Sequence, residues 1–171
     1  MHNAPRLPSS SRAGRGSPWI TALFVSLLGG ATLPLTGCTQ GHAPRKVEFL
    51  AAPATGDVAP IINNEQKRAA REGRKVLVYV GATWCEPCQR FHHAAADGKL
   101  DAAFPNLRFV EFDSDRDGER LATAGYVSRF IPLFARPGSD GRASGRQIEG
   151  SVKGEGAVDE ITPRLRQLLA D

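Results

Sequence analysis

Apolar residues gather from residue 57 onward in short continuous runs and in sets with helical spacing. Residues 76–80 form an uninterrupted apolar run rich in valine, which predicts a strand buried on both faces. Residues 158–169 place apolar side chains three and four positions apart, which predicts an amphipathic closing helix. Similar patterns, with glycine and proline as stop signals, predict helices over 58–72, 86–96, 99–104 and 119–124, strands over 107–112 and 147–149, a further strand into which residues 131–134 lead, and a polar turn over 138–145.

The order of these elements predicts an α/β fold. Strands that alternate with helices form parallel pairs, and the final strand, turn and strand add an antiparallel hairpin. We therefore expect a central mixed sheet of four or five strands flanked by helices. The strand count depends on residues 47–50, a short apolar run that is either an edge strand or part of a linker. The segment from residue 57 to the end, about 115 residues, is long enough for one ordinary core.

The first 37 residues have the pattern of an export signal. Three arginines precede an uncharged, mostly apolar run over 19–35, which leads into Leu-Thr-Gly-Cys at 35–38. This tetrapeptide resembles a bacterial lipobox, and the resemblance implies that Cys38 is acylated and becomes the mature N-terminus. We expect a lipoprotein signal peptide over 1–37, a lipidated flexible tether over 38–56 and a globular domain over 57–171. The alternative is an uncleaved membrane anchor, although 17 residues make a short span.

The export signal changes the interpretation of charge and of the cysteines. We expect a protein that is anchored by lipid to a bacterial membrane, with its domain facing the periplasm or the exterior. Of 22 basic residues, three precede Cys38, which leaves 19 against 18 acidic residues. A neutral domain of this kind has no basic face to neutralise several phosphates, so we expect no nucleic-acid partner. An exported compartment permits disulfides, and Cys85 and Cys88 remain to form one.

The segment with the most informative chemistry is Gly-Ala-Thr-Trp-Cys-Glu-Pro-Cys at residues 81–88. It follows the buried strand and opens an expected helix, so both sulfurs belong to the first helical turn. Unpaired backbone N–H groups and the positive end of the helix dipole favour a thiolate there. Pro87 suits this turn because its missing N–H is not needed. We expect Cys85 to be the exposed nucleophile and Cys88, one turn deeper, to resolve the mixed disulfide.

These residues resemble the active site of the thioredoxin superfamily. The match consists of Trp-Cys-x-Pro-Cys at 84–88 after an apolar strand and of the Ile131–Pro132 pair before the third strand. The resemblance covers roughly residues 57–171 and implies a thioredoxin-like fold. It also implies that Pro132 is cis and lies beside Cys85, where Ile131 offers backbone hydrogen bonds to a bound polypeptide. It implies no cofactor beyond the redox-active disulfide, and it assigns to substrate binding Trp84, Glu86, Pro87, Ile131 and Pro132.

Different parts of the chain resemble different branches of this superfamily. Glu86 is similar to the spacer of exported, membrane-tethered thioredoxins used in cytochrome c maturation. Residues 91–113 are similar to short exported domains of the disulfide-reductase type. The approach to the proline over 126–130 is one residue longer than usual, and Leu133 stands where threonine is common.

One departure from the superfamily pattern concerns proton transfer. Many thioredoxins have a buried acid six residues before the first cysteine, and in this chain the position holds Tyr79. A phenol is a poor base at neutral pH. We therefore expect proton transfer to use water or Glu86.

Other interpretations of the same residues stay open. His92 and His93 follow Cys88 closely enough to complete a zinc site, although such a site gives no purpose to the neighbouring tryptophan and proline. The two cysteines could also form a purely structural disulfide. Residues 113–118 imitate the opening of a calcium loop, but the twelfth position is Ala124 instead of glutamate. We expect this segment to be a turn that caps the next helix, and we expect no bound metal.

The favoured function is that of an extracytoplasmic thiol–disulfide oxidoreductase, and more narrowly of a protein-disulfide reductase. Its expected partners are proteins with disulfides or thiols, a redox partner that supplies electrons, and the membrane through the lipid on Cys38. We expect a monomer. The alternative function is a thiol-based binding protein or metallochaperone, for example in cytochrome c or copper-site maturation, and Tyr79 in place of the acid keeps it open. A third possibility is an interaction scaffold that does not use the thiols.

Overall fold

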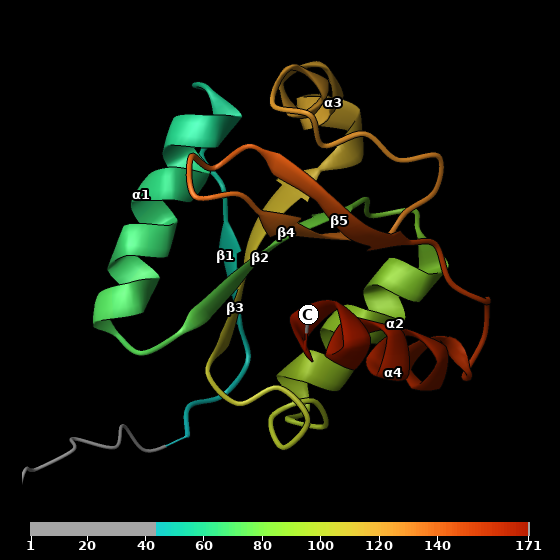
Figure 1. Cartoon of the computed structure of the whole chain (residues 1–171). Helices are drawn as coiled ribbons and strands as arrows, with labels where there is room; N and C mark the ends of the chain where they lie inside the picture. Colours follow the sequence, from blue (N-terminus) through green and yellow to red (C-terminus); the bar gives the residue numbers. More distant parts are fainter. Residues whose placement is uncertain (1–43, 171) are drawn as a thin grey trace, which may run out of the picture. The chain divides into compact units, whose positions relative to one another are not determined.

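The computed structural model describes residues 44–170, which form five strands and four helices (Figure 1). Their arrangement is an α/β fold with a mixed five-stranded sheet flanked by helices, which confirms the expected fold class. In chain order the elements are β1 (Glu48–Ala51), α1 (Val58–Arg71), β2 (Lys75–Gly81), α2 (Glu86–Ala96), β3 (Leu107–Asp113), α3 (Ser114–Thr123), β4 (Leu133–Pro137), β5 (Ala143–Glu149) and α4 (Ala157–Ala170).

The five strands form one sheet in the order β1-β3-β2-β4-β5. β1, β3 and β2 run parallel, with Phe49 and Leu77 both opposite Phe109. β4 runs antiparallel to β2, and β5 returns antiparallel along β4 as the predicted hairpin. A parallel crossover cannot be made by a tight turn, which is why helices connect the first three strands.

Side chains of the central strand β2 alternate between two apolar layers. One layer, shared with α2 and α4, contains the buried side chains Leu77, Tyr79, Phe91, Phe134 and Leu165. The opposite layer, shared with α1 and α3, contains Ile62, Val78, Val80 and Leu121. Burial on both faces explains why β2 is a continuous apolar run, because neither side of the strand faces water.

The edge strand β1 corrects the expected domain boundary. It pairs with β3 along its whole length, and Ala52 extends the ladder with a backbone hydrogen bond of 2.8 Å to Glu111. Residues 48–51 therefore belong to the sheet, and the tether expected over 38–56 is too long at its C-terminal end. The sequence left this undecided because four residues carry too little pattern to separate a strand from a linker.

Two segments expected to be short helices also differ. α3 begins at Ser114, five residues earlier than expected, because the Asp113 side chain accepts hydrogen bonds of 2.9 Å from the backbone N–H groups of Asp115 and Arg116. Residues 99–104 form turns, with Asp101 N–H bonded to the Gly98 carbonyl at 3.2 Å. The segment is too short for a helix to be stable without capping.

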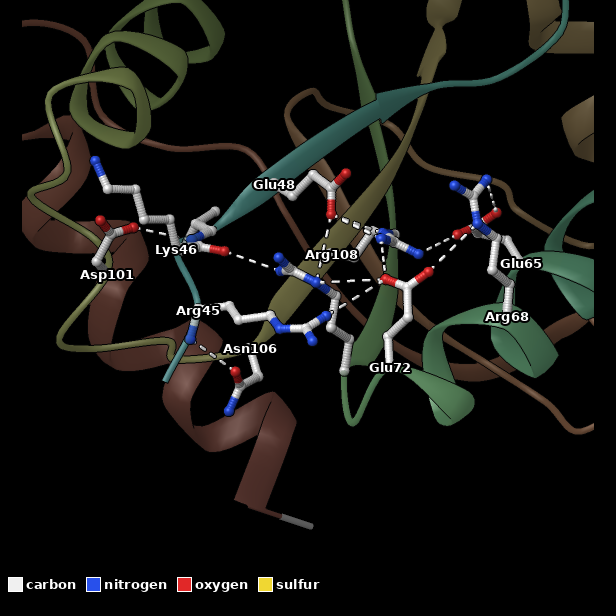
Figure 2. Close-up of polar contacts among 11 residues, drawn as sticks. Arg45, Lys46, Glu48, Glu65, Arg68, Glu72, Asp101, Asn106 and Arg108 are labelled. Atoms are coloured by element: carbon white, nitrogen blue, oxygen red, sulfur yellow. Dashed lines mark hydrogen bonds and ion pairs between the residues drawn. The ribbon is translucent and has the colours of Figure 1, made fainter. Parts of the chain in front are cut away.

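A buried guanidinium joins β1 and α1 to β3. Arg108 of β3 is 3% exposed and bonds Glu48 of β1 at 2.9 Å, Glu72 at the end of α1 at 2.7 Å, and Glu65 within α1. We call these four residues the Arg108 cluster. Figure 2 shows the three carboxylates converging on Arg108, with Arg68 at the outer edge. The Arg108 cluster therefore links the edge strand β1 to helix α1.

Candidate active site

Cys85 and Cys88 lie at the start of α2 and form a disulfide with an S–S distance of 2.07 Å. Cys85 is the N-cap residue, and its Sγ accepts a hydrogen bond from the Cys88 backbone N–H at 3.3 Å. Pro87 occupies the first turn, as expected. Sulfur thus takes the place that an oxygen usually has at a helix N-terminus. When the disulfide is reduced, this position stabilises negative charge on Cys85.

Both cysteines are buried, which corrects the expectation of an exposed Cys85. Cys85 is 4% exposed and Cys88 is 2% exposed. Cys85 nevertheless lines a surface groove. The walls of this groove come from residues 127–131 and 150–153, far along the chain, so the local motif could not predict them.

The groove that contains Cys85 has a volume of about 860 Å³. We call it the Cys85 groove. All four exposed large apolar side chains among the described residues line it, namely Trp84, Val127, Phe130 and Val152. Charged side chains from Lys153 and Arg164 also reach it. An apolar rim around a reactive sulfur suits contact with a polypeptide, because exposed apolar side chains that gather around one groove mark interaction sites.

Trp84 is held over this groove by a hydrogen bond to α3. Its indole Nε1–H donates to Asp115 Oδ2 at 2.8 Å, while two-thirds of the residue stays exposed. The bond fixes one end of an otherwise free ring. Trp84 therefore presents a defined apolar surface beside Cys85.

The Ile131–Pro132 peptide bond is cis. Ile131 lines the Cys85 groove, and Pro132 is buried. The preceding loop is held by Glu149 of β5, whose Oε2 accepts hydrogen bonds from the Arg129 and Phe130 backbone N–H groups at 2.7 and 3.4 Å. Sequence reasoning missed Glu149, because nothing in its local pattern distinguishes it from an exposed strand carboxylate.

Glu86 positions the loop that precedes α4. Its two carboxylate oxygens accept hydrogen bonds from the Gly154 backbone N–H at 3.2 and 3.0 Å, and it pairs with Arg90 on the next turn. The hydrogen bond from Arg90, followed by that from Gly154, lowers the pKa of Glu86. The carboxylate therefore stays ionised and bound to Gly154 and Arg90. It stabilises the wall of the groove and is a weak proton acceptor.

Tyr79 is fully buried behind the cysteines. Burial, followed by the charge of Glu111, raises the pKa of its phenol, so Tyr79 stays neutral and is not a base. Its hydroxyl has no hydrogen-bond partner among residues 44–170. The absent side chain of Gly81 makes room for it, because a Cβ there would lie 2.6 Å from the hydroxyl oxygen.

A second cavity, with a volume of about 500 Å³, lies next to Cys88. We call it the Cys88 cavity. Tyr79, His92 and Glu111 line it, and Cys85 does not. His92 Nε2 is 2.7 Å from Glu111 Oε1. Sequence reasoning noted that His92 is one turn after Cys88, but the register that brings Glu111 opposite Tyr79 was not visible in the sequence.

The acidic and histidine side chains do not assemble into a metal site. Within residues 44–170, no group of three or more His, Cys, Asp or Glu residues is placed to hold a metal ion. In the segment that imitates a calcium loop, Asp113 caps α3 and buried Asp117 pairs with Arg116 and Arg120. This segment is the first turn of α3 itself, and not the separate turn before the helix that was expected.

The expected membrane attachment lies mostly outside the described residues. Cys38, assigned to lipidation, and the expected signal peptide over 1–37 both belong to the undescribed part. Between residues 44 and 170, every helix is too short or too polar to cross a membrane.

Comparison with known proteins connects this geometry to a family. Residues 61–135 match a family model described as thioredoxin-like, and this segment includes both cysteines and the cis proline. Among solved structures, the chain is similar to a thioredoxin of Trichomonas vaginalis, with 23% identity and a TM-score of 0.44, covering 73% of this chain and 96% of that one. It is also similar to a poplar thioredoxin h, with 19% identity and a TM-score of 0.44, covering 74% and 99%. A search of curated proteins gives no match.

Proposed function

The chain contains a domain of the thioredoxin superfamily, and from this premise we propose that it is an extracytoplasmic protein-disulfide reductase. The fold and the Cys85–Cys88 disulfide support a thiol–disulfide oxidoreductase in general. The observation that carries the proposed exchange with polypeptide disulfides is the position of Cys85. It caps a helix, lines an apolar groove and shares that groove with Ile131 of the cis pair.

The reaction begins from the dithiol, which a redox partner regenerates. The Cys85 thiolate attacks one sulfur of a substrate disulfide, and the other substrate sulfur leaves as a thiolate that takes a proton. Cys88 then attacks Cys85, the second substrate sulfur leaves, and the Cys85–Cys88 disulfide forms. Two electrons pass from the protein to the substrate, which becomes a dithiol. A partner dithiol reduces the protein again, at the cost of its own oxidation to a disulfide.

The substrate class we propose is a polypeptide with a disulfide in an apolar segment. Trp84 and Phe130 are 66% and 60% exposed, and both line the Cys85 groove. Exposed rings of this size gain free energy when a partner covers them. Substrate selection is therefore expected to depend on apolar residues that flank the cystine.

The location outside the cytoplasm and the lipid anchor are part of this proposal. They are supported by the uncharged run over 19–35 and by Leu-Thr-Gly-Cys at 35–38. Labelled palmitate fed to expressing cells should enter the wild-type chain and not a Cys38→Ala variant. Equal labelling of both chains, or of neither, would contradict lipidation at Cys38.

The experiment that tests the reductase role is a measurement of the reduction potential. The full chain with Cys38→Ala, in which Cys85 and Cys88 are the remaining cysteines, is equilibrated with dithiothreitol buffers and its free thiols are trapped. We expect a reduction potential close to that of reducing thioredoxins, which is about −270 mV. A potential close to that of a strong oxidant, about −120 mV, would reverse the proposed direction of electron flow, and the lack of a reversible couple would overturn the proposed function.

A further inference from the structure

Resolution of the mixed disulfide requires Cys88 to lose a proton, and neither Tyr79 nor Glu86 is placed to accept it. Tyr79 occupies the strand position of the expected acid, and its phenol stays neutral. Glu86 is bound to Gly154 and Arg90, and it lines the Cys85 groove and not the Cys88 cavity. A proton acceptor for Cys88 must therefore be found in the Cys88 cavity.

An imidazole–carboxylate pair lines this cavity. His92 lies one helical turn after Cys88 on α2, and its Nε2 is 2.7 Å from Oε1 of Glu111 on β3. The imidazole ring also packs against Phe49 of β1, with 4.0 Å between ring centroids, and against Tyr79 at 5.2 Å. The ring is thus fixed by three strands. About a third of each side chain of the pair remains exposed, at 34% and 31%, so solvent reaches it.

The other polar groups around the cavity are hydrogen-bonded, neutral or exposed to solvent. Asp113 of β3 accepts backbone hydrogen bonds at the start of α3, and Arg116 of α3 pairs with Asp117. His93, the neighbouring imidazole on α2, is exposed and forms no ion pair within the described residues. The Tyr79 hydroxyl of β2 is buried without a protein partner and lines the cavity. Water in the cavity can hydrogen-bond to this hydroxyl.

We propose that His92, oriented by Glu111, accepts the Cys88 proton through water in the Cys88 cavity when the mixed disulfide is resolved. This inference rests on the proposed function. In the neutral ring, Nε2 donates its hydrogen to Glu111, and Nδ1 keeps the lone pair that receives a proton. The Glu111 carboxylate then stabilises the imidazolium, as a carboxylate does in a catalytic triad. Glu111 is a positioning residue, and its pair with His92 does the work of the acid absent at Tyr79.

The Cys88 S–H bond breaks, its proton passes along the water to His92, and the electron pair stays on Cys88 sulfur. This thiolate attacks Cys85 Sγ, the bond between Cys85 and the substrate breaks, and the substrate sulfur leaves with that electron pair. The protein loses two electrons to the substrate, and the imidazolium returns its proton to solvent.

The test separates the two thiol steps with one reagent. The full chain with Cys38→Ala is reduced, mixed with one equivalent of Ellman's reagent (5,5′-dithiobis-2-nitrobenzoate) and followed by stopped-flow absorbance. The first release of thionitrobenzoate reports attack by Cys85, and the second reports resolution by Cys88. At neutral pH we expect His92→Gln to slow the second release at least about a hundredfold, the lower end of the range for a lost general base, and to leave the first within about twofold. Glu111→Gln should slow the second release by a smaller factor.

The pH dependence distinguishes proton transfer from a structural effect. Above about pH 9 a thiol ionises without a base, so the rates of the wild type and His92→Gln should converge. A structural defect would persist at high pH. His92→Phe keeps an aromatic ring against Phe49 and serves if His92→Gln is unstable. The matched control His93→Gln removes the adjacent imidazole, and a second release slowed as strongly in this control would overturn the assignment to His92.

Failure of this inference is distinguishable from failure of the proposed function. A normal first release with a second release that is indifferent to His92→Gln would overturn the role of His92 alone. The lack of any fast first release would overturn the proposed function itself.

Discussion

At Gly81, a side chain as small as a methyl group would lie 2.6 Å from the Tyr79 hydroxyl oxygen. We predict that Gly81→Ala lowers the free energy of unfolding by about 1–3 kcal/mol, because the buried ring must shift in a packed core. Urea denaturation measures the change. The control is Gly118→Ala in α3, where an added Cβ meets nothing within 4 Å and helix propensity favours alanine by about 1 kcal/mol. Equal losses in the two variants would contradict the crowding around Tyr79.

Glu86 gives a prediction about pH. Its pKa is lowered in the folded protein, chiefly by the hydrogen bond from Arg90 and then by that from Gly154. A lowered folded-state pKa contributes stability that is complete above the ordinary glutamate value of about 4.3 and is lost as pH falls through the folded value. The stability difference between wild type and Glu86→Gln should therefore be largest near neutral pH and shrink in acid.

Urea midpoints of both chains from pH 7 to pH 3 measure this difference. Glu119→Gln is the control, because Glu119 of α3 is exposed and its side chain forms no ion pair among residues 44–170. A difference for Glu86→Gln that stays constant with pH would show that its carboxylate charge does not hold the loop at Gly154.

The chemistry of single residues was predictable where it depends on neighbours in the chain. Cys85, Cys88 and Pro87 share the first turn of α2, so their spacing was enough to place them. The burial of Cys85 was not predictable, because its groove is walled by segments more than 40 residues away. The His92–Glu111 contact depends on the register of β3 against β2, which no local pattern encodes.

Among the elements, β1 depends most on charged contacts. Arg108 is buried with three carboxylates, and its loss would leave Glu65, itself 8% exposed, without its buried partner. We predict that Arg108→Met costs about 3–5 kcal/mol of unfolding free energy, the usual loss when one member of a buried pair is removed. Arg68→Met is the control, because Arg68 pairs with two of the three carboxylates, Glu65 and Glu72, from an exposed position and should cost at most about 1 kcal/mol. Similar losses in both variants would contradict a buried role for Arg108.

The elements themselves were predicted in proportion to the strength of their patterns. β2 and α4 combine length with clear apolar periodicity, and both were found close to their expected bounds. β1 has four residues, and its place in the sheet depends on β3 and the Arg108 cluster. The start of α3 was missed because its first turn is polar, so the capping aspartate and not apolar spacing defines it.

At the scale of the whole molecule, the Cys85 groove predicts that loss of a rim side chain slows the reaction with large substrates and leaves the reaction with small ones unchanged. Phe130→Ser removes one exposed ring from the rim without touching either cysteine. We expect kcat/KM for a cystine-bridged apolar peptide to fall roughly tenfold, which corresponds to about 1.4 kcal/mol of lost contact. The rate with 2-hydroxyethyl disulfide, which is too small to reach the rim, should stay unchanged. An equal decrease with both substrates would show that Phe130 acts on the thiols and not on substrate binding.

The two cysteines of one disulfide line different hollows, Cys85 the Cys85 groove and Cys88 the Cys88 cavity. Residues that would meet the proposed partner and residues that surround Cys88 are therefore separate sets. Such a separation lets mutation alter one property without penalty to the other. A lineage that carries this domain could exchange one client protein for another through changes at the groove rim, while the speed of thiol exchange is inherited intact.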